Sequence, residues 1–239
     1  PKQVFAHGWL LVGGEKMSKS KLTGIAPAQI IDHFSSDAFR YYFMRAIAFG
    51  QDGSFSWEDM SARYTAELAN GLGNLASRAT AMVNRYCDGK LPAPGQYTDA
   101  ESGLQDLLAE IVPAADAAVE ALEFATAIGH VRGFVETVNG YVTDVEPLVL
   151  AKDPANESRL HTVLYTICES LRAIAVLYNP VMPKAMTAMW EQIGAAECLG
   201  ALGEQPISTV AQWGQLVPGV TVTKGDALFP RLEDPDAAA

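Results

Sequence analysis

A long helical seam constrains this chain most strongly, because it requires a packed bundle of helices. Apolar residues recur in alternating steps of four and three, which places them on one face of a helix. The seam consists of Leu68, Leu72, Leu75, Ala79, Met82 and Tyr86. A helix with one apolar face buries that face against other helices, so we expect an antiparallel α-helical bundle over residues 57–195.

Capping and breaking residues divide the rest of this region into further helices. Thr98 and Glu101 have capping-box spacing and open one helix, which Pro113 is expected to kink or divide. Three more helices are predicted over residues 125–142, 157–178 and 182–193. The chain is therefore expected to be mainly α-helical.

The first 56 residues indicate a small strand–loop–helix unit instead. Residues 4–12 are short, apolar and aromatic, which predicts a strand. A polar, lysine-rich loop follows the strand, and helices are expected over residues 28–34 and 37–49, the second one capped by Ser36. Glycines and prolines become frequent near the end, where residues 196–239 are expected to pack back toward this first unit.

The charge is distributed unevenly along the chain. The net charge is −11, yet residues 1–90 hold ten Lys and Arg against eight Asp and Glu, for a net +2. Residues 91–239 hold seven against twenty, for a net −13. The first third can therefore hold a polyanion while the acidic remainder faces solvent, and only a contact over the whole surface is excluded.

Composition also limits the location of the protein. No apolar run reaches the roughly 18 residues of a membrane span, and no signal peptide opens the chain. The cysteines Cys87, Cys168 and Cys198 are odd in number and far apart. We expect reduced, structural cysteines in a cytoplasmic protein without a membrane partner.

The sharpest chemical signal is the segment Lys16-Met17-Ser18-Lys19-Ser20, which a third lysine follows. Ammonium groups on a short polar loop can close over a triphosphate and stabilise the charge that develops as pyrophosphate leaves. An arbitrary Lys/Ser cluster is more often a solvated basic loop. The fixed order and the preceding strand favour the functional interpretation here.

A second set of polar residues lies beside the apolar seam. On a wheel of about 100° per residue, Asn70, Asn74, Arg78 and Arg85 fall within an arc of about 80° next to the apolar one. Amide and guanidinium groups read unpaired RNA bases, and arginine also pairs with phosphate. By periodicity alone, an ordinary solvated helix face is the more frequent explanation.

Several motifs carry a resemblance to a known family. HGWLLVGGEKMSKS, over residues 7–20, resembles the signature loop of class I aminoacyl-tRNA synthetases. NLASR at 74–78, NPVMP at 179–183 and LFPR at 228–231 resemble methionyl-tRNA synthetases, in the expected order over essentially the whole chain. The resemblance implies that residues 1–56 end a Rossmann-type catalytic domain and that residues 57–195 form an anticodon-binding bundle.

The resemblance also implies a reaction and the residues that serve it. The family activates methionine with ATP and Mg²⁺ to methionyl-adenylate and transfers the acyl group to tRNA(Met). Lys19 would stabilise the departing pyrophosphate with help from Lys16, and residues 16–20 would bind ATP. Asn74 and Arg78 match the family positions that contact the CAU anticodon.

Two departures from the family pattern affect these expectations. The family commonly places a tryptophan after a proline in the loop that reads the anticodon, whereas this chain has Pro147 and Leu148. Leu148 offers apolar contact without an aromatic face, so either stacking is weaker or other residues compensate. The family's HIGH motif is absent, and we expect the C-terminal part of a longer synthetase, monomeric and inactive alone.

Other interpretations remain open from the residues alone. The four histidines lack metal-ligand spacing, so we expect no metal site in the chain. Within the enzyme class, a synthetase for valine, isoleucine or leucine is the alternative, since these enzymes share the signature loop. A free-standing tRNA-binding module without catalysis and a helical protein-interaction scaffold are alternatives from other classes.

Overall fold

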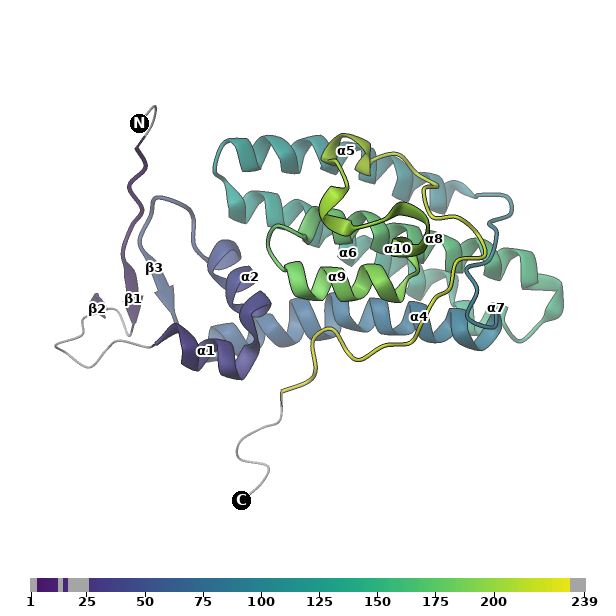
Figure 1. Ribbon diagram of the computed structural model, residues 1–239, viewed down its shortest axis with the longest axis horizontal. Helices are drawn as coiled ribbons and strands as arrows, with labels where there is room; N and C mark the ends of the chain where they lie inside the picture. Colours follow the sequence, from purple (N-terminus) through teal and green to yellow (C-terminus); the bar gives the residue numbers. More distant parts are fainter. Residues whose placement is uncertain (1–3, 13–14, 17–25, 233–239) are drawn as a thin grey trace, which may run out of the picture.

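The structure is a computed structural model that describes residues 4–12, 15–16 and 26–232. A small unit of strands and two helices lies at one end of the molecule, beside a larger block of packed helices (Figure 1). The C-terminal segment runs back along this block toward α1 (Pro27–Phe34) (Figure 1). The prediction of a mainly helical chain is confirmed.

The small unit is built around a three-stranded sheet. Its strands are β1 (Leu10–Val12), β2 (Glu15–Lys16) and β3 (Gly53–Phe55), in the order β2-β1-β3. β1 pairs antiparallel with β2 and parallel with β3. Helices α1 and α2 (Ser36–Ala46) connect the two parallel strands. A parallel pair joined through helices is the crossover unit of α/β proteins.

Three sequence predictions for this unit need correction. The strand expected over residues 4–12 covers only Leu10–Val12, because β3 offers a hydrogen-bonding neighbour for only three residues. Glu15 and Lys16, which were expected in the lysine-rich loop, form the short strand β2. The second helix ends at Ala46, and its cap is Ser35, whose side chain accepts a hydrogen bond from the backbone N–H of Ala38.

The larger block contains the remaining helices. They are α3 (Trp57–Arg63), the π-helix η2 (Tyr64–Gly73), α4 (Asn74–Tyr86), α5 (Asp99–Glu120), α6 (Phe124–Val145), α7 (Pro147–Leu150), the 3₁₀ turn η3 (Pro154–Asn156), α8 (Glu157–Tyr178), α9 (Pro183–Gln192), α10 (Ala195–Leu199), the 3₁₀ turn η4 (Leu202–Glu204) and α11 (Ile207–Val210). Apolar residues of these elements, η3 excepted, join those of α1, α2 and β3 in one core.

Helices α3, η2 and α4 form one continuous helical rod, and the apolar seam lies on its η2 and α4 parts. All residues of the seam through Met82 are buried, as predicted, and only Tyr86 remains half-buried. The π-helical part was not foreseen, since π turns are rare. A π-helix turns less per residue than an α-helix, so the helical wheel holds from Asn74 onward and not for Asn70.

Helix α5 begins at the predicted capping box but is not divided at Pro113. Thr98 and Glu101 cap each other's backbone N–H groups, and the helix then continues unbroken to Glu120. A proline inside a helix costs roughly 3 kcal/mol. Buried residues on both sides, such as Ile111 and Ala115, offset that cost by packing in the core.

Helix α8 forms the centre of the block, with the bounds that the sequence predicts. In the described part of the chain, the stretch Pro154–Tyr178 alone is long and apolar enough to pass a length-and-composition test for a membrane span. Its most apolar window is 94% buried inside the protein, as expected for the core helix of a bundle. Its apolar character is thus explained by packing.

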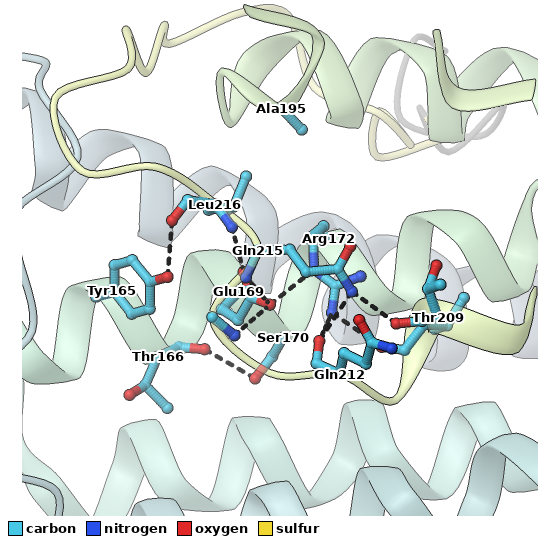
Figure 2. Close-up of polar contacts among 12 residues, drawn as sticks. Tyr165, Thr166, Glu169, Ser170, Arg172, Ala195, Thr209, Gln212, Gln215 and Leu216 are labelled. Carbon is cyan, nitrogen blue, oxygen red and sulfur yellow. Dashed lines mark hydrogen bonds and ion pairs between the residues drawn. The ribbon is translucent and has the colours of Figure 1, made fainter. Parts of the chain in front are cut away.

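A buried polar cluster on α8 fixes the C-terminal segment (Figure 2). The Arg172 guanidinium donates through Nε to a Glu169 oxygen at 2.8 Å and through Nη2 to the carbonyls of Val210 and Gln212. The Glu169 carboxylate also accepts from the backbone N–H groups of Gly214, Gln215 and Leu216 at 3.0–3.1 Å. Both side chains are almost fully buried, and their charges are satisfied within the fold.

Candidate nucleic-acid interface

The three residues predicted to contact RNA lie on α4 and α7. Asn74 and Arg78 are one turn apart on α4, where Asn74 is exposed and Arg78 is partly exposed. Leu148 lies on the short helix α7 and is 52% exposed. Helix α7 lies near the end of α4 that is farther from the N-terminal sheet (Figure 1).

Backbone geometry explains why Leu148 faces outward. Glu146 adopts a left-handed conformation with φ of 50°, which ends α6 and turns the chain sharply. Pro147 then occupies the first helical position of α7, which its fixed φ favours, and it is buried. With Pro147 buried, Leu148 and Val149 are left on the surface.

Arg78 and Leu148 line the same small surface pocket, although they are far apart in the sequence. The pocket has a volume of about 200 Å³, and its other lining residues are Ala81, Met82, Arg85 and Tyr86. This volume lies below the roughly 300–1,000 Å³ of pockets for drug-sized ligands. The pocket therefore suits one small group, and none of its lining side chains is acidic.

The two arginines of the pocket differ from most others in the fold. Neither Arg78 nor Arg85 forms a hydrogen bond or an ion pair with any residue that the structure describes. Six arginines do form such bonds with protein oxygens: Arg40, Arg45, Arg63, Arg132, Arg159 and Arg172. The pocket thus presents two guanidinium groups with free donors to solvent, which complements an anionic ligand.

An aromatic ring supports one of these arginines. The guanidinium carbon of Arg85 lies over the ring of Tyr86, 5.2 Å from its centroid. Cation–π contacts of this kind contribute about 0.5–1 kcal/mol at exposed sites. Arg85 is itself exposed, so its other face is accessible.

The structure therefore brings together two of the three predicted residues. Asn74 is exposed on the same face of α4, one turn before Arg78, but it does not line the pocket. Sequence reasoning left Arg85 and Tyr86 out of the proposed site. The helical wheel had already placed Arg85 on the same polar arc as Arg78, and that shared arc could have added Arg85 to the site, whereas Tyr86 was assigned to the buried seam.

The predicted ATP-binding segment lies mostly outside the described residues. The backbone of Lys16 belongs to β2, opposite Leu11 of β1. Met17, Ser18, Lys19 and Ser20 lie outside the described residues. In residues 4–12, 15–16 and 26–232, no group of three or more His, Cys, Asp or Glu residues could hold a metal ion.

Two known families match successive parts of the chain. Residues 1–80 match the family described as tRNA synthetases class I (M), which defines the class of protein. Residues 91–239 match the anticodon binding domain of methionyl tRNA ligase. The chain belongs to the methionyl-tRNA synthetase family, and the resemblance seen in its motifs is confirmed.

Individual relatives agree with this assignment. The methionine–tRNA ligase of Streptomyces coelicolor is 55% identical over all of this chain, and that of Bacillus subtilis is 42% identical over 98% of it. The chain spans 45% and 34% of those proteins, less than half of each. Mycobacterium tuberculosis methionyl-tRNA synthetase in complex with methionyl-adenylate superposes on 97% of this chain, which covers 44% of that structure, with a TM-score of 0.88 and 33% identity.

Proposed function

We propose that this chain is the tRNA-reading part of a methionine–tRNA ligase and that the pocket between α4 and α7 contacts the anticodon. One observation carries the proposal: Arg78 and Leu148, predicted from separate segments of the sequence, line one small pocket that contains no acidic side chain. A pocket with two free guanidinium groups and an apolar wall matches an unpaired nucleotide, which has a phosphate and a base.

Asn74 extends this interface along α4. Its amide is exposed one turn from Arg78, and an amide can both donate and accept hydrogen bonds at a base edge. We propose that Asn74 and Arg78 recognise the CAU anticodon of tRNA(Met), with Leu148 in apolar contact with a base. The acidic surface of the remaining helices would face solvent.

The catalytic role that we propose belongs to the lysine-rich segment after β1. Lys19 would stabilise the charge on the departing pyrophosphate of ATP, which enters as the Mg²⁺ complex, with Lys16 assisting and Met17, Ser18 and Ser20 completing the ATP-binding loop. In support, residues 1–80 match the class I synthetase family, and β2 starts this segment directly beside β1. Methionine and ATP would be substrates of the whole protein, which we expect to be a cytoplasmic monomer.

Separate measurements of the two reaction steps test the anticodon role. In a full-length protein that carries this chain, Asn74→Ala or Arg78→Ala should slow tRNA charging and leave methionine-dependent pyrophosphate exchange nearly unchanged. Loss of an interaction with a charged group predicts a decrease in kcat/KM for tRNA of roughly tenfold or more. An equal decrease in both steps would show that this helix face is structural.

The same protein tests the catalytic role. Lys19→Ala should lower the rate of pyrophosphate exchange by roughly 10²–10³, the effect of removing a transition-state donor. Undiminished exchange would refute the role of Lys19. A protein that binds tRNA(Met) but forms no adenylate at all would instead favour the alternative of an RNA-binding module without catalysis.

A further inference from the structure

We infer that Arg85 is the stacking platform for one anticodon base, supported from below by Tyr86 and faced by Leu148. The inference rests on the proposed function, because it assigns a role within the same pocket. Leu148 has no aromatic face, so any planar group on which a base stacks in this pocket must come from another residue. The platform is a guanidinium plane rather than an aromatic ring.

The pocket between α4 and α7 is small and has an apolar wall. Arg85, Tyr86 and Leu148 all line the same small cavity. A cavity of about 200 Å³ with an apolar side chain on one wall suits a single planar group. Unpaired RNA bases stack on aromatic side chains and on guanidinium planes alike.

Tyr86 and Arg85 are layered on one another beside the pocket. Tyr86 is half-buried and packs against the core, so its ring is fixed by its surroundings. Arg85 lies over that ring at 5.2 Å and is exposed on its outer side. Because Arg85 and Tyr86 both line the pocket, a base that enters it can stack on the guanidinium while the tyrosine ring supports that guanidinium. The stack would be tyrosine, guanidinium and base, closed by the Leu148 side chain.

The positive charges of Arg85 and Arg78 are not neutralised by a described carboxylate. Arg85 has no carboxylate partner among the residues described, so no intramolecular ion pair must break before RNA binds. Arg78 lines the same pocket and is likewise unpaired in the described part of the chain, which leaves it to contact a phosphate or a base edge. Arg85 can thus contact a base through its guanidinium plane, while Arg78 contributes its positive charge.

The test is binding of anticodon stem-loop RNA to the full 239-residue chain, measured by fluorescence anisotropy. The probes are a stem-loop with a CAU anticodon and three versions with an abasic nucleotide at one anticodon position. Wild-type protein should lose roughly 5- to 150-fold in affinity with one of the abasic probes, the range expected for one stacked base.

Arg85→Lys is the decisive variant, because it keeps the charge and removes the plane. The affinity of Arg85→Lys for the intact CAU stem-loop should be lower than that of wild type by a similar factor. Its affinity should not fall further with the abasic probe that weakens binding by wild type. The slope of affinity against salt should stay unchanged, since the number of cations is the same. The inference would be overturned if Arg85→Lys bound the intact stem-loop as tightly as wild type. It would also be overturned if the loss of affinity from Arg85→Lys simply added to the loss from every abasic nucleotide.

Control variants separate stacking from general effects. Arg132→Lys makes the same exchange on α6, at an arginine that is paired with Glu136, and should change binding of no probe. Tyr86→Phe keeps the supporting ring and should bind as wild type, whereas Tyr86→Leu should weaken binding. Circular dichroism confirms that each variant is folded.

The results also distinguish this inference from the proposed function. If wild-type protein binds the CAU stem-loop no better than a hairpin with an altered loop, the anticodon role itself fails. If wild type discriminates the two hairpins and Arg85→Lys does so equally well, only the stacking role of Arg85 fails.

Discussion

Two arginines of this protein, Arg172 and Arg85, differ in whether their hydrogen-bond donors are used within the fold. Arg172 on α8 is buried, and its donors bond to Glu169 and to backbone carbonyls of the C-terminal segment. Arg85 on α4 lies over an aromatic ring at the surface and has no acidic partner among the described residues. The donors of Arg172 are satisfied within the fold, whereas those of Arg85 have no protein acceptor in the described part of the chain.

The two arginines are expected to differ in the loss of stability that their replacement causes. Removing one member of a buried ion pair leaves the other charge desolvated and unpaired, which costs about 3–5 kcal/mol. An exposed arginine without a partner leaves nothing unpaired when it is replaced, and such changes usually alter stability by less than about 0.5 kcal/mol. Stability and RNA affinity should therefore respond to different arginines.

The largest effect is expected for Arg172→Met. Glu169 would keep its three backbone donors but lose its cation, so the free energy of unfolding should decrease by roughly 3–5 kcal/mol in urea titrations. Replacing both partners, as in Glu169→Gln with Arg172→Met, should recover part of that loss. Unchanged stability in the single variant would break the comparison.

A second buried carboxylate gives a pH-dependent prediction. Glu101 is fully buried and is held by Arg159 at 2.7 Å, by Tyr141 and by Thr98. Burial favours the neutral carboxyl, but these hydrogen bonds outweigh it and lower the pKa of Glu101 to about 2. A folded-state pKa below that of the unfolded chain stabilises the fold above about pH 5, and this contribution is lost between about pH 5 and 2.

Glu101→Gln should therefore destabilise the protein at neutral pH by roughly 1–3 kcal/mol, measured by chemical unfolding. Its stability should also fall less steeply than that of wild type as the pH decreases through this window. Glu110→Gln removes a carboxylate from an exposed position of the same helix, α5, and serves as the control. Parallel pH profiles for wild type and Glu101→Gln would contradict the assignment.

Arg78→Ala should show the opposite behaviour to Arg172→Met. Its free energy of unfolding should stay within about 0.5 kcal/mol of wild type, because Arg78 has no polar partner in the part of the chain that the structure describes. Its affinity for the CAU stem-loop should fall roughly tenfold or more. A large decrease in stability would place Arg78 with the structural arginines.

The smallest effect is expected for Arg231→Ala. Arg231 is exposed and also lacks a partner among the described residues, but it does not line the pocket. Neither the unfolding free energy nor the discrimination between CAU and altered stem-loops should change. Loss of discrimination in this variant would mean that unpaired arginines act by overall charge rather than by their position in the pocket.

The sequence predicted the bounds of a helix well where a clear local signal, such as a breaker or a capping box, sets them. Helix α8 has the predicted bounds because a long apolar run ends at clear breakers, and the capping box at Thr98 begins α5 as expected. Pro113 does not divide α5, because burial in the core outweighs the cost of the proline. The short strand β1 was overestimated because strand length depends on a distant partner, β3.

The candidate site shows the same limit. Motif and helix-face patterns identified Asn74, Arg78 and Leu148 separately, but only tertiary packing shows that α7 brings Leu148 to Arg78. Tyr86 continues the apolar period and was therefore assigned to the core. It lies at the end of the rod, where packing is incomplete, so its ring is left half-buried beneath Arg85. Partial burial of this kind is not encoded in periodicity.

Photocrosslinking tests the central claim most directly. A tRNA(Met) stem-loop whose anticodon uridine is replaced by thiouridine would be irradiated in complex with the chain, and the linked peptides identified by mass spectrometry. The account predicts crosslinks within residues 74–86 of α4 and 147–150 of α7, and their loss when unlabelled CAU stem-loop competes. Crosslinks confined to other helices, with none in these two segments, would contradict it.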